Sequence, residues 1–451
     1  MVATDTIVAS ATPFGISGIA VVRLSGSGAL DIATQLSTAA GTRSLTFKPR
    51  LATHVFLYVD GQPFDEVIAT YFKAPFSYTG DDMVEVSCHG NPVIVESVIA
   101  ESCRLGARVA EPGEFTRRAF LNGKLDLVQA ESVAGIIGAQ SAESSRLNLR
   151  LLQGQLSERL FDLRDRIIAL LAEVEFELDV SEDEMNPGLK TKTQNILSGL
   201  LTDIHRLLAT YAQGRILSKG VDVVIIGAPN VGKSTLLNAL SARERAIVSA
   251  IPGTTRDTID VPLLIEGVPI NLIDTAGLRT NAEEIEREGI RRTHQRINTA
   301  DLLLLVCEPP YVNQLPAFNN PGNVQVIVVN NKIDKLPDKS PNYNIARDAV
   351  YISAKEGAGL DVLRSRIKAA LNISSGPASE VMLTTARQHQ ALDKCRTTLD
   401  SAALLMTSAK TEFELVALEL RESIDAIDKL LGKTTADEIL NRIFGAFCVG
   451  K

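Results

Sequence analysis

Residues 221–234 read VDVVIIGAPNVGKS, a short apolar run followed by a glycine-rich turn, and residues 235–240 continue as an apolar stretch with helical spacing. The turn has the glycine, lysine and serine spacing of a phosphate-binding loop between a strand and a helix. Its glycines let backbone N–H groups converge on phosphate oxygens, Lys233 neutralises the β and γ charges, and the Ser234 hydroxyl can bind Mg2+. The stretch therefore predicts a nucleotide-binding α/β domain.

Three further motifs follow at the expected ends of strands: Asp274-Thr-Ala-Gly277, Asn331-Lys-Ile-Asp334 and Ser353-Ala-Lys355. Asp274 can hold Mg2+ through water, and the Gly277 amide can sense the γ-phosphate. The Asp334 carboxylate suits the N1 and exocyclic amine donors of guanine, a pair that adenine lacks. We therefore expect GTP, and not ATP, as the substrate. The residues expected to contact GTP are Asn230, Val231, Gly232, Lys233, Ser234, Thr235, Ser249, Thr254, Thr255, Asp274, Thr275, Ala276, Gly277, Asn331, Lys332, Asp334, Ser353, Ala354 and Lys355.

The segment Ser249-Ala-Ile-Pro-Gly-Thr-Thr-Arg-Asp257 is the expected switch loop, which orders on the γ-phosphate. Within it, Thr255 is the natural second hydroxyl ligand of Mg2+. No glutamine follows Gly277 to orient the attacking water, because Leu278 stands there. Hydrolysis then needs another base, and one of the acids in residues 281–288 can act through a bridging water.

The positive charge that stabilises the transition state has two candidate sources. Arg256 and Arg279 lie in the two switch segments. A monovalent cation between the α- and γ-phosphates can supply the same charge, with the Asn230 amide oxygen as one ligand. The spacing leaves both sources open.

Away from these motifs, the chain divides into segments whose residue patterns differ. Residues 1–118 mix β-branched runs with Gly and Pro turns, which predicts an α+β domain. Residues 119–217 predict helices, since apolar residues from Leu149 to Leu178 recur at steps of three and four along one long helix. Residues 218–374 alternate strands with helices, as in a doubly wound parallel sheet of the Ras-like GTPase kind. Helical spacing returns over 375–451, so we expect this α/β domain to be inserted into a helical bundle. Its expected strands are VDVVIIG, INLID, ADLLLLVCE, VQVIVVN and VYISA.

Composition bounds the class of protein. The chain has 451 residues, with hydrophobic residues at 45% and charged residues at 22%, as in ordinary globular proteins. Lys and Arg number 46 against 54 Asp and Glu, so the net charge of -8 excludes a general nucleic-acid binder, and any RNA contact needs a local patch or a partner. Five scattered cysteines without a CxxC pair predict a reducing cytoplasm. We expect no secretion signal and no membrane span.

These motifs, the terminal Cys448-Val-Gly-Lys451 and the segment from Glu111 to Lys124 (EPGEFTRRAFLNGK) closely resemble the MnmE (TrmE) family of tRNA modification GTPases. The resemblance covers essentially the whole chain. It implies a homodimer whose N-terminal domain is similar to folate-binding one-carbon enzymes and holds a 5,10-methylene- or 5-formyl-tetrahydrofolate. The folate contacts of the family fall on Arg23, Glu85, Lys124 and Lys451.

The resemblance also implies K+, and it matches Glu286 to the water-orienting acid. It implies a flavoprotein partner, MnmG, with which the GTPase adds an aminomethyl-type or carboxymethylaminomethyl group to C5 of the wobble uridine (U34) of certain tRNAs. Folate gives the one-carbon unit, while FAD and much of the tRNA surface belong to the partner. The K+ ligands fall on Asn230, Ser249, Ile251 and Thr254.

Cys448 has two interpretations. A free cysteine is most often a small buried hydrophobe. If the C-terminal residues reach the folate pocket, with Lys451 paired to a carboxylate, a Cys448 thiolate can instead act as a catalytic nucleophile or proton carrier beside the one-carbon unit.

A second class of function stays open from the sequence. Ribosome-associated GTPases share the phosphate loop and use GTP hydrolysis only to time RNA binding. Such a factor should carry a basic RNA-binding module beside its GTPase domain. Here an acidic bundle and a terminal Cys-Val-Gly-Lys stand in that place, which favours the tRNA-modifying enzyme.

Overall fold

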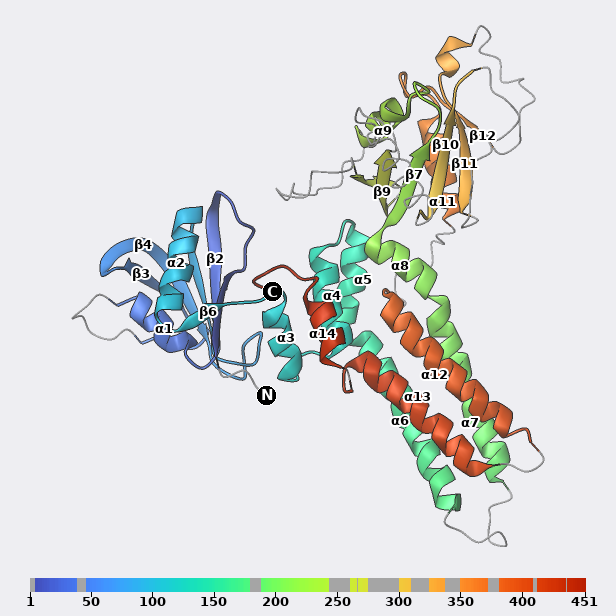
Figure 1. Ribbon diagram of the computed structural model, residues 1–451, viewed down its shortest axis with the longest axis horizontal. Coiled ribbons are helices and arrows are strands. Elements are labelled where there is room, and N and C mark those ends of the chain that lie inside the picture. Colours follow the sequence, from blue (N-terminus) through green and yellow to red (C-terminus); the bar gives the residue numbers. More distant parts are fainter. Residues whose placement is uncertain are drawn as a thin grey trace, which may run out of the picture. The chain divides into compact units, whose positions relative to one another are not determined.

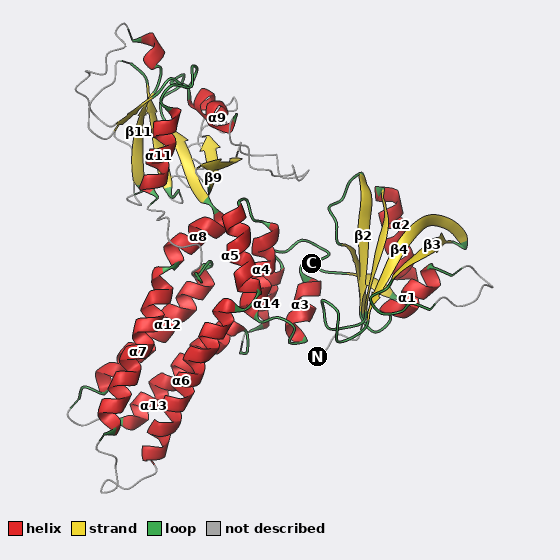
Figure 2. Cartoon of the chain, turned by 180° about the vertical axis from the view of Figure 1, so that it is seen from behind, coloured by secondary structure: helices red, strands yellow, loops and turns green. Residues whose placement is uncertain are grey.

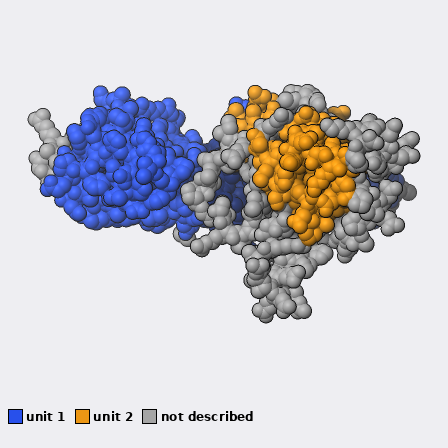
Figure 3. Space-filling view, turned by 90° about the horizontal axis from the view of Figure 1, so that it is seen from above, with its two compact units in different colours: residues 1–134, 151–194, 397–451 blue, residues 135–150, 195–396 orange. Residues whose placement is uncertain are grey.

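The chain forms two compact units, coloured separately in Figure 3. Unit 1 comprises residues 1–134, 151–194 and 397–451, and unit 2 comprises residues 135–150 and 195–396. The four domains expected at 1–118, 119–217, 218–374 and 375–451 stay a prediction. The computed structural model describes residues 5–38, 46–178, 188–242, 260–265, 267–274, 300–309, 324–336, 349–371, 381–408, 412–434 and 436–451.

Six strands of unit 1 form one sheet in the order β3-β4-β5-β2-β1-β6. Figures 1 and 2 label β2, β3 and β4 of this sheet. β1 and β6 are parallel, and the other neighbours are antiparallel. α1 and α2 pack on one face, since their buried residues join a single core with the sheet. The elements are β1 (Thr6–Ser10), β2 (Ser17–Ser25), α1 (Ala29–Leu36), β3 (Ala52–Val59), β4 (Gln62–Phe72), β5 (Met83–Gly90), α2 (Pro92–Arg104), β6 (Ala107–Val109) and α3 (Glu114–Leu121).

The helical part of unit 1 is built from both flanks of the inserted α/β segment. α6 (Gln155–Leu178) and α13 (Phe413–Leu431) pack against each other. Across this pair, Arg164 Nε donates to Asp428 Oδ1 at 2.6 Å. The expected bundle built from the two flanks is therefore confirmed. The same unit holds α14 (Asp437–Phe444) and parts of α4 (Leu127–Ile137), α7 (Leu189–Ala209) and α12 (Ala386–Leu405).

The prediction of one helix from Leu149 to Leu178 is wrong at its start. α5 (Ala142–Leu152) ends before α6 begins, and Gly154 between them has φ +88°. A positive φ of this size suits glycine and ends a helix, so α6 begins as a separate helix. Leu149 is consequently 47% exposed. The apolar stripe is buried on α6 at Leu156, Leu160, Leu163, Ile167, Leu170 and Val174.

Six strands of unit 2 form the second sheet, in the order β12-β11-β10-β7-β9-β8. All neighbours are parallel except β8 and β9, which form an antiparallel hairpin. Val223 packs toward α9 and α11, while Val224 joins a buried cluster on the opposite face, so both faces are buried, as continuous apolar strands predict. The elements are β7 (Val221–Ile226), α9 (Lys233–Ser241), β8 (Asp260–Ile265), β9 (Val268–Asp274), β10 (Leu302–Cys307), β11 (Gln325–Asn330), η3 (Ile333–Lys335), β12 (Ala349–Tyr351) and α11 (Leu360–Ala370), with α8 (Tyr211–Lys219) before the sheet.

None of the described helices is long and apolar enough to cross a membrane.

Candidate functional site

The phosphate loop connects β7 to α9 in unit 2, and two of its glycines are required by close backbone approaches. A Cβ at Gly227, where φ is +152°, would lie 2.3 Å from the Val306 carbonyl oxygen of the neighbouring strand. A Cβ at Gly232, where φ is +99°, would lie 2.4 Å from Asn331 Nδ2. The loop is therefore pressed against the ends of two neighbouring segments, and its backbone leads directly into the positive N-terminus of α9.

Lys233, the first residue of α9, has a buried side chain that folds back over the loop. Its Nζ donates to the carbonyl oxygens of Gly227 at 3.0 Å and Ala228 at 2.8 Å. The ammonium adds its charge to that of the helix N-terminus, which makes this loop a site for anionic oxygens. Val231 is buried beneath the loop, and Ser234 and Thr235 are exposed in the first turn of α9.

The segments that follow β11 and β12 lie beside the phosphate loop. Asn331 Nδ2 donates to the Val231 carbonyl oxygen at 2.9 Å, and Asn331 Oδ1 accepts from the Ala354 N–H at 3.0 Å. One buried asparagine thus joins three loops. Lys332 Nζ donates to the Asn230 carbonyl oxygen at 2.6 Å. The structure therefore brings together residues that the sequence placed in three separate motifs.

Asp334 is exposed and is held by its neighbour across the site. Ser353 Oγ donates to Asp334 Oδ1 at 2.6 Å, and this hydrogen bond lowers the pKa of the Asp334 carboxyl. An ionised carboxylate is an acceptor only, with lone pairs left for two further donors. It can therefore recognise the paired N–H groups of a guanine edge. Lys355, also expected at the site, is exposed directly after Ala354.

Several predicted GTP and metal residues lie outside the described residues. Asp274 is described in its backbone only: it ends β9 and pairs in register with Ile225 of β7, the strand that leads into the phosphate loop. Its backbone therefore reaches the same edge of the sheet. The predicted residues outside the described ranges are Ser249, Ile251, Thr254, Thr255, Thr275, Ala276, Gly277 and Glu286.

A second candidate site lies in unit 1, on neighbouring strands of the N-terminal sheet. Arg23 of β2 and Glu85 of β5 are register partners, and Arg23 Nη2 donates to Glu85 Oε1 at 2.6 Å. The guanidinium also lies 5.5 Å from the ring centroid of Tyr78 and 5.6 Å from that of Phe115. A cation held between a carboxylate and two rings can receive both an anionic and an aromatic part of a ligand.

The C-terminal residues are fastened beside this pair. The Gly113 N–H donates to the Cys448 carbonyl oxygen at 3.4 Å, and the Phe115 N–H donates to the Lys451 carbonyl oxygen at 3.2 Å. A Cβ at Gly450, where φ is +96°, would lie 2.0 Å from the Ser10 carbonyl oxygen, so only glycine fits there. These contacts bring the end of the described chain against the N-terminus of α3.

Lys451 and Cys448 differ in their surroundings. Burial lowers the pKa of the Lys451 ammonium, the charge of Arg23 lowers it further, and the charge of Glu85 partly opposes both. Three of the four predicted folate residues therefore lie within one another's electrostatic reach. Cys448 is exposed and free. The fourth residue, Lys124, is exposed and donates from Nζ to the Pro75 carbonyl oxygen at 3.1 Å.

Sequence reasoning missed the two aromatic rings around Arg23. Phe115 lies inside the quoted segment from Glu111 to Lys124, and Tyr78 lies in the Ser77-Tyr-Thr-Gly80 turn. Their aromatic character was visible in the sequence. The pairing with Arg23 was not, because it depends on how β2, α3 and the turn meet in the fold.

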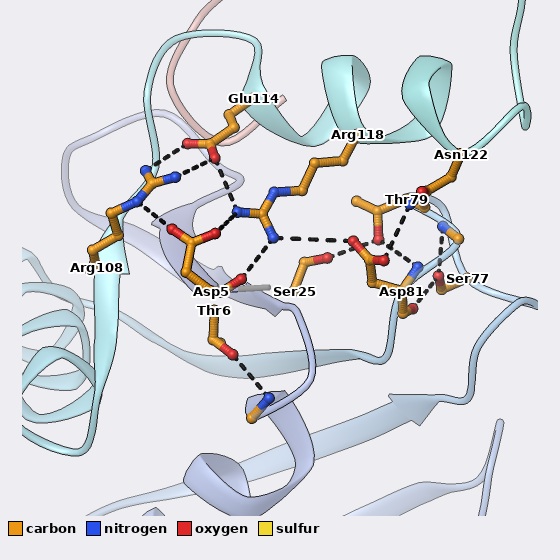
Figure 4. A network of polar contacts seen from close by, with 12 residues as sticks. Asp5, Thr6, Ser25, Ser77, Thr79, Asp81, Arg108, Glu114, Arg118 and Asn122 are labelled. Carbon is orange, nitrogen blue, oxygen red and sulfur yellow. Dashed lines mark hydrogen bonds and ion pairs between the residues drawn. The ribbon is translucent and has the colours of Figure 1, made fainter. Parts of the chain in front are cut away.

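A network of charged side chains fixes α3 to the start of β1 (Figure 4). Arg118 has a side chain only 4% exposed and donates to Asp5 Oδ1 at 2.8 Å and to Glu114 Oε1 at 3.0 Å. Arg108 binds the same two carboxylates, with Nη2 to Glu114 Oε1 at 2.6 Å and Nε to Asp5 Oδ2 at 2.6 Å. Because α3 carries Phe115, this network also positions the aromatic side of the Arg23 site.

The same network extends to the turn that carries Tyr78. Asn122, which directly follows α3, donates from Nδ2 to the Thr79 carbonyl oxygen at 2.8 Å and to Asp81 Oδ1 at 3.1 Å. Ser25 and Thr79 share a buried hydroxyl hydrogen bond of 2.7 Å. The two rings around Arg23 are therefore supported by one connected set of polar contacts.

Replacing Arg118 with Met should destabilise unit 1 by about 2 kcal/mol at pH 7, since it removes a buried guanidinium that donates to Asp5 and Glu114 and leaves the buried Glu114 carboxylate with Arg108 as its remaining ion-pair partner. Burial opposes ionisation of Asp5 and Glu114, but the hydrogen bonds and charges of Arg108 and Arg118 outweigh it and lower both carboxyl pKa values. Carboxyls with a lowered folded pKa stabilise above the unfolded value, about 4, and lose that stabilisation as pH falls through the folded value. Urea unfolding followed by circular dichroism should therefore show a smaller loss at pH 2.5 than at pH 7.

The matched control for this substitution is Arg421→Met, which breaks an ion pair of the same unit whose Arg421 and Glu175 side chains are 61% and 41% exposed. It should cost less than about 1 kcal/mol at either pH. Burial raises the pKa of Asp81 and the charge of Arg118 partly opposes that rise, so the loss of Arg118 should also cost more at pH 7, where Asp81 is ionised, than at pH 2.5. An equal loss for Arg118→Met at both pH values would contradict the ionic account of the network.

Two family profiles match this chain, one after the other. The profile described as GTP-binding protein TrmE N-terminus matches residues 6–124. The profile described as MnmE helical domain matches residues 127–448. The first covers the sheet of unit 1 with its Arg23 site, and the second runs from α4 to Cys448.

Curated relatives match over nearly their whole length. The tRNA modification GTPase MnmE of Chlorobium chlorochromatii (strain CaD3) is 41% identical over 468 aligned positions. The alignment covers 99% of this chain and 98% of the relative. The protein of the same name from Legionella pneumophila (strain Corby) is 39% identical and covers 99% of each chain. That of Aquifex aeolicus (strain VF5) is 38% identical and covers 99% of this chain and 100% of its own. With such identity over both full lengths, this chain belongs to the MnmE (TrmE) family.

Proposed function

We propose that this chain is a GTP-hydrolysing enzyme of tRNA modification. The observation that carries the GTPase part is the meeting of the phosphate loop, the Asn331–Asp334 segment and Ser353 at the carboxyl ends of parallel strands. Lys233 and the N-terminus of α9 provide positive charge that binds phosphates, and the Asp334 carboxylate selects guanine over adenine. The tRNA part rests on the name that the curated relatives carry.

Two cations fit the residues of this site. Ser234 is an exposed residue in the first turn of α9, and with Thr255 it would hold Mg2+, which neutralises charge on the β and γ oxygens when bound. Asn230 is exposed and has φ +64°, which turns the loop sharply at that residue. With Ser249, Ile251 and Thr254 it would hold K+, which supplies positive charge near the phosphates.

If K+ takes the place of an arginine at the transition state, GTP hydrolysis should rise at least about tenfold when Na+ is replaced by K+ at constant ionic strength. Asn230→Ala should flatten this response, because one oxygen ligand is lost. Steady-state phosphate release in the two salts measures it. Equal wild-type rates in Na+ and K+ would count decisively against the cation.

The finer part of the proposal concerns unit 1. We place a one-carbon tetrahydrofolate at the Arg23 site, where Arg23, Lys124 and Lys451 offer cations for its glutamate tail and Glu85 offers a carboxylate for its pterin ring. The rings of Tyr78 and Phe115 add an aromatic lining that suits a pterin. With the flavoprotein MnmG as partner, a folate held there would supply the one-carbon unit for C5 of U34. Because the substrate is tRNA, we place the homodimer and its partner in the cytoplasm.

Cys448 supplies a test that separates unit 1 from GTP hydrolysis. Its carbonyl oxygen accepts a hydrogen bond from the Gly113 N–H beside the Arg23 site, and the residue is exposed. If this thiol acts on the one-carbon unit, Cys448→Ser should abolish U34 modification in the presence of MnmG, folate and tRNA, while it retains wild-type GTP hydrolysis. Mass spectrometry of digested tRNA measures the first, and phosphate release the second.

A matched control is Cys103→Ser, which changes another thiol of unit 1, one that is half-buried on α2. It should leave U34 modification intact. Full modification by Cys448→Ser would return that residue to the interpretation of a structural cysteine.

A further inference from the structure

Glu308 follows β10 and belongs to none of the GTPase motifs. β10 and β11 are neighbouring parallel strands whose last residues, Cys307 and Asn330, are register partners. The Asn331 N–H extends this pairing by donating to the Cys307 carbonyl oxygen at 2.8 Å. Since parallel neighbours leave a sheet at the same edge, Glu308 emerges beside Asn331 and Lys332.

Lys332 joins Glu308 to the phosphate loop. Its ammonium donates to the Asn230 carbonyl oxygen at 2.6 Å and also hydrogen-bonds the Glu308 carboxylate. The Lys332 side chain is 20% exposed, and its backbone lies in the left-handed region at φ 65°, ψ 37°, which non-glycine residues adopt infrequently. A lysine side chain is long and flexible, so two partners for one ammonium restrict it to one orientation.

At this edge of the unit 2 sheet, the Glu308 carboxylate is a negative charge that balances two lysines. The hydrogen bond from Lys332, with the charges of Lys332 and Lys335, lowers the pKa of the Glu308 carboxyl. Glu308 is therefore ionised at neutral pH and faces two cations. Without its charge, Lys332 and Lys335 would repel each other, and the Lys332 ammonium would keep only its neutral carbonyl partner.

We propose that Glu308 is a positioning residue for the guanine nucleotide: by holding Lys332 against Asn230, it ties the base-reading segment to the phosphate loop. The inference rests on the function proposed above and adds a residue to the site. Glu308 acts through Lys332 and makes no contact with the nucleotide of its own. Its expected effect is to slow the release of bound nucleotide, and the chemical step is left unchanged.

The direct test is the dissociation rate of a fluorescent GDP from the full chain, measured by stopped flow. Glu308→Gln keeps the size and removes the charge, so dissociation should accelerate about tenfold, the effect of one lost charge-assisted contact. The turnover rate at saturating GTP should stay within about twofold, because chemistry is untouched. Glu308→Asp keeps the charge and should restore dissociation to within about threefold. An unchanged dissociation rate in Glu308→Gln, or a loss confined to turnover, would overturn the proposal.

A double-mutant cycle tests whether Glu308 acts through Lys332. In a Lys332→Met background, Glu308→Gln should change dissociation no further, whereas additive effects would overturn the proposal. The matched control is Asp361→Asn, which removes the carboxylate of another ion pair of unit 2, with Arg364 at 2.6 Å, and should leave dissociation as in wild type. Equal thermal midpoints exclude general unfolding. If the wild-type protein does not prefer GDP over ADP, the proposed function is wrong. If it does prefer GDP and Glu308→Gln leaves the dissociation rate unchanged, only the inference about Glu308 is wrong.

Discussion

Asp334→Asn should turn this GTPase into an enzyme that prefers xanthosine triphosphate, with the ratio of the two affinities changed on the order of 10⁴-fold. The asparagine oxygen can still accept from Ser353 Oγ, which lies 2.6 Å from the carboxylate oxygen in the native chain. Its new Nδ2 donor then faces the base, where it opposes the N–H groups of guanine and matches the extra carbonyl of xanthine. Competition of the two triphosphates against a fluorescent GDP measures the change.

The control for this prediction is Asp334→Ala, which removes the acceptor and adds no donor. It should weaken both triphosphates and favour neither. Retained preference for GTP in Asp334→Asn would contradict the assignment of guanine recognition to this carboxylate.

Glu286→Ala should lower GTP turnover by ~10² or more, the scale of a lost general base or water orienter, with nucleotide affinity nearly intact. This expectation comes from the sequence, because Leu278 stands where a glutamine would orient water and Glu286 matches the acid of the family. Single-turnover phosphate release at saturating enzyme, with a separate binding titration, measures both quantities.

Two neighbouring acids serve as matched controls for Glu286. Glu283→Ala and Glu288→Ala change the same acidic segment and should each alter turnover by less than about threefold. If affinity and turnover fall together in Glu286→Ala, the substitution has damaged the loop, and the assignment of a water-orienting acid is contradicted.

The sequence predicted the parts of the fold whose patterns are local and strong. The apolar runs at β7, β10 and β11 are continuous because both faces of the unit 2 sheet are buried, and such runs are read directly as strands. The insertion of this sheet into a helical bundle followed from helical spacing on both flanks, and the packing of α6 on α13 confirms it.

Elements set by pairing and turn geometry were missed. β8 is an edge strand that contains Pro262, which argues against a strand when the sequence is read alone, and only its pairing with β9 across a turn at Gly267 creates it. The break between α5 and α6 depends on one residue, Gly154, inside an otherwise continuous apolar pattern. The periodicity of apolar residues cannot reveal such a break, because the leucines keep their helical spacing on both sides of Gly154.

The candidate sites divide in the same way. Motif spacing predicted the loops that carry Lys233, Asn331 and Asp334, since each loop follows its strand in the chain. The contacts between loops join residues far apart in sequence, such as Asn331 and Val231, which are 100 positions apart. In unit 1, Arg23 lies 5.6 Å from the ring centroid of Phe115 on α3, a helix that a charged network holds to Asp5 at the start of β1. No local sequence pattern predicts these contacts between distant residues.

We propose that GTP hydrolysis by this chain drives a change of the wobble base of tRNA. The most direct measurement is the mass of the U34 nucleoside after incubation of the purified chain with MnmG, methylene-tetrahydrofolate, glycine or ammonium, and unmodified tRNA. We predict a C5 aminomethyl-type product with GTP in K+ and none with a non-hydrolysable GTP analogue. Unmodified U34 with GTP, or equal product with the analogue, would contradict the claim.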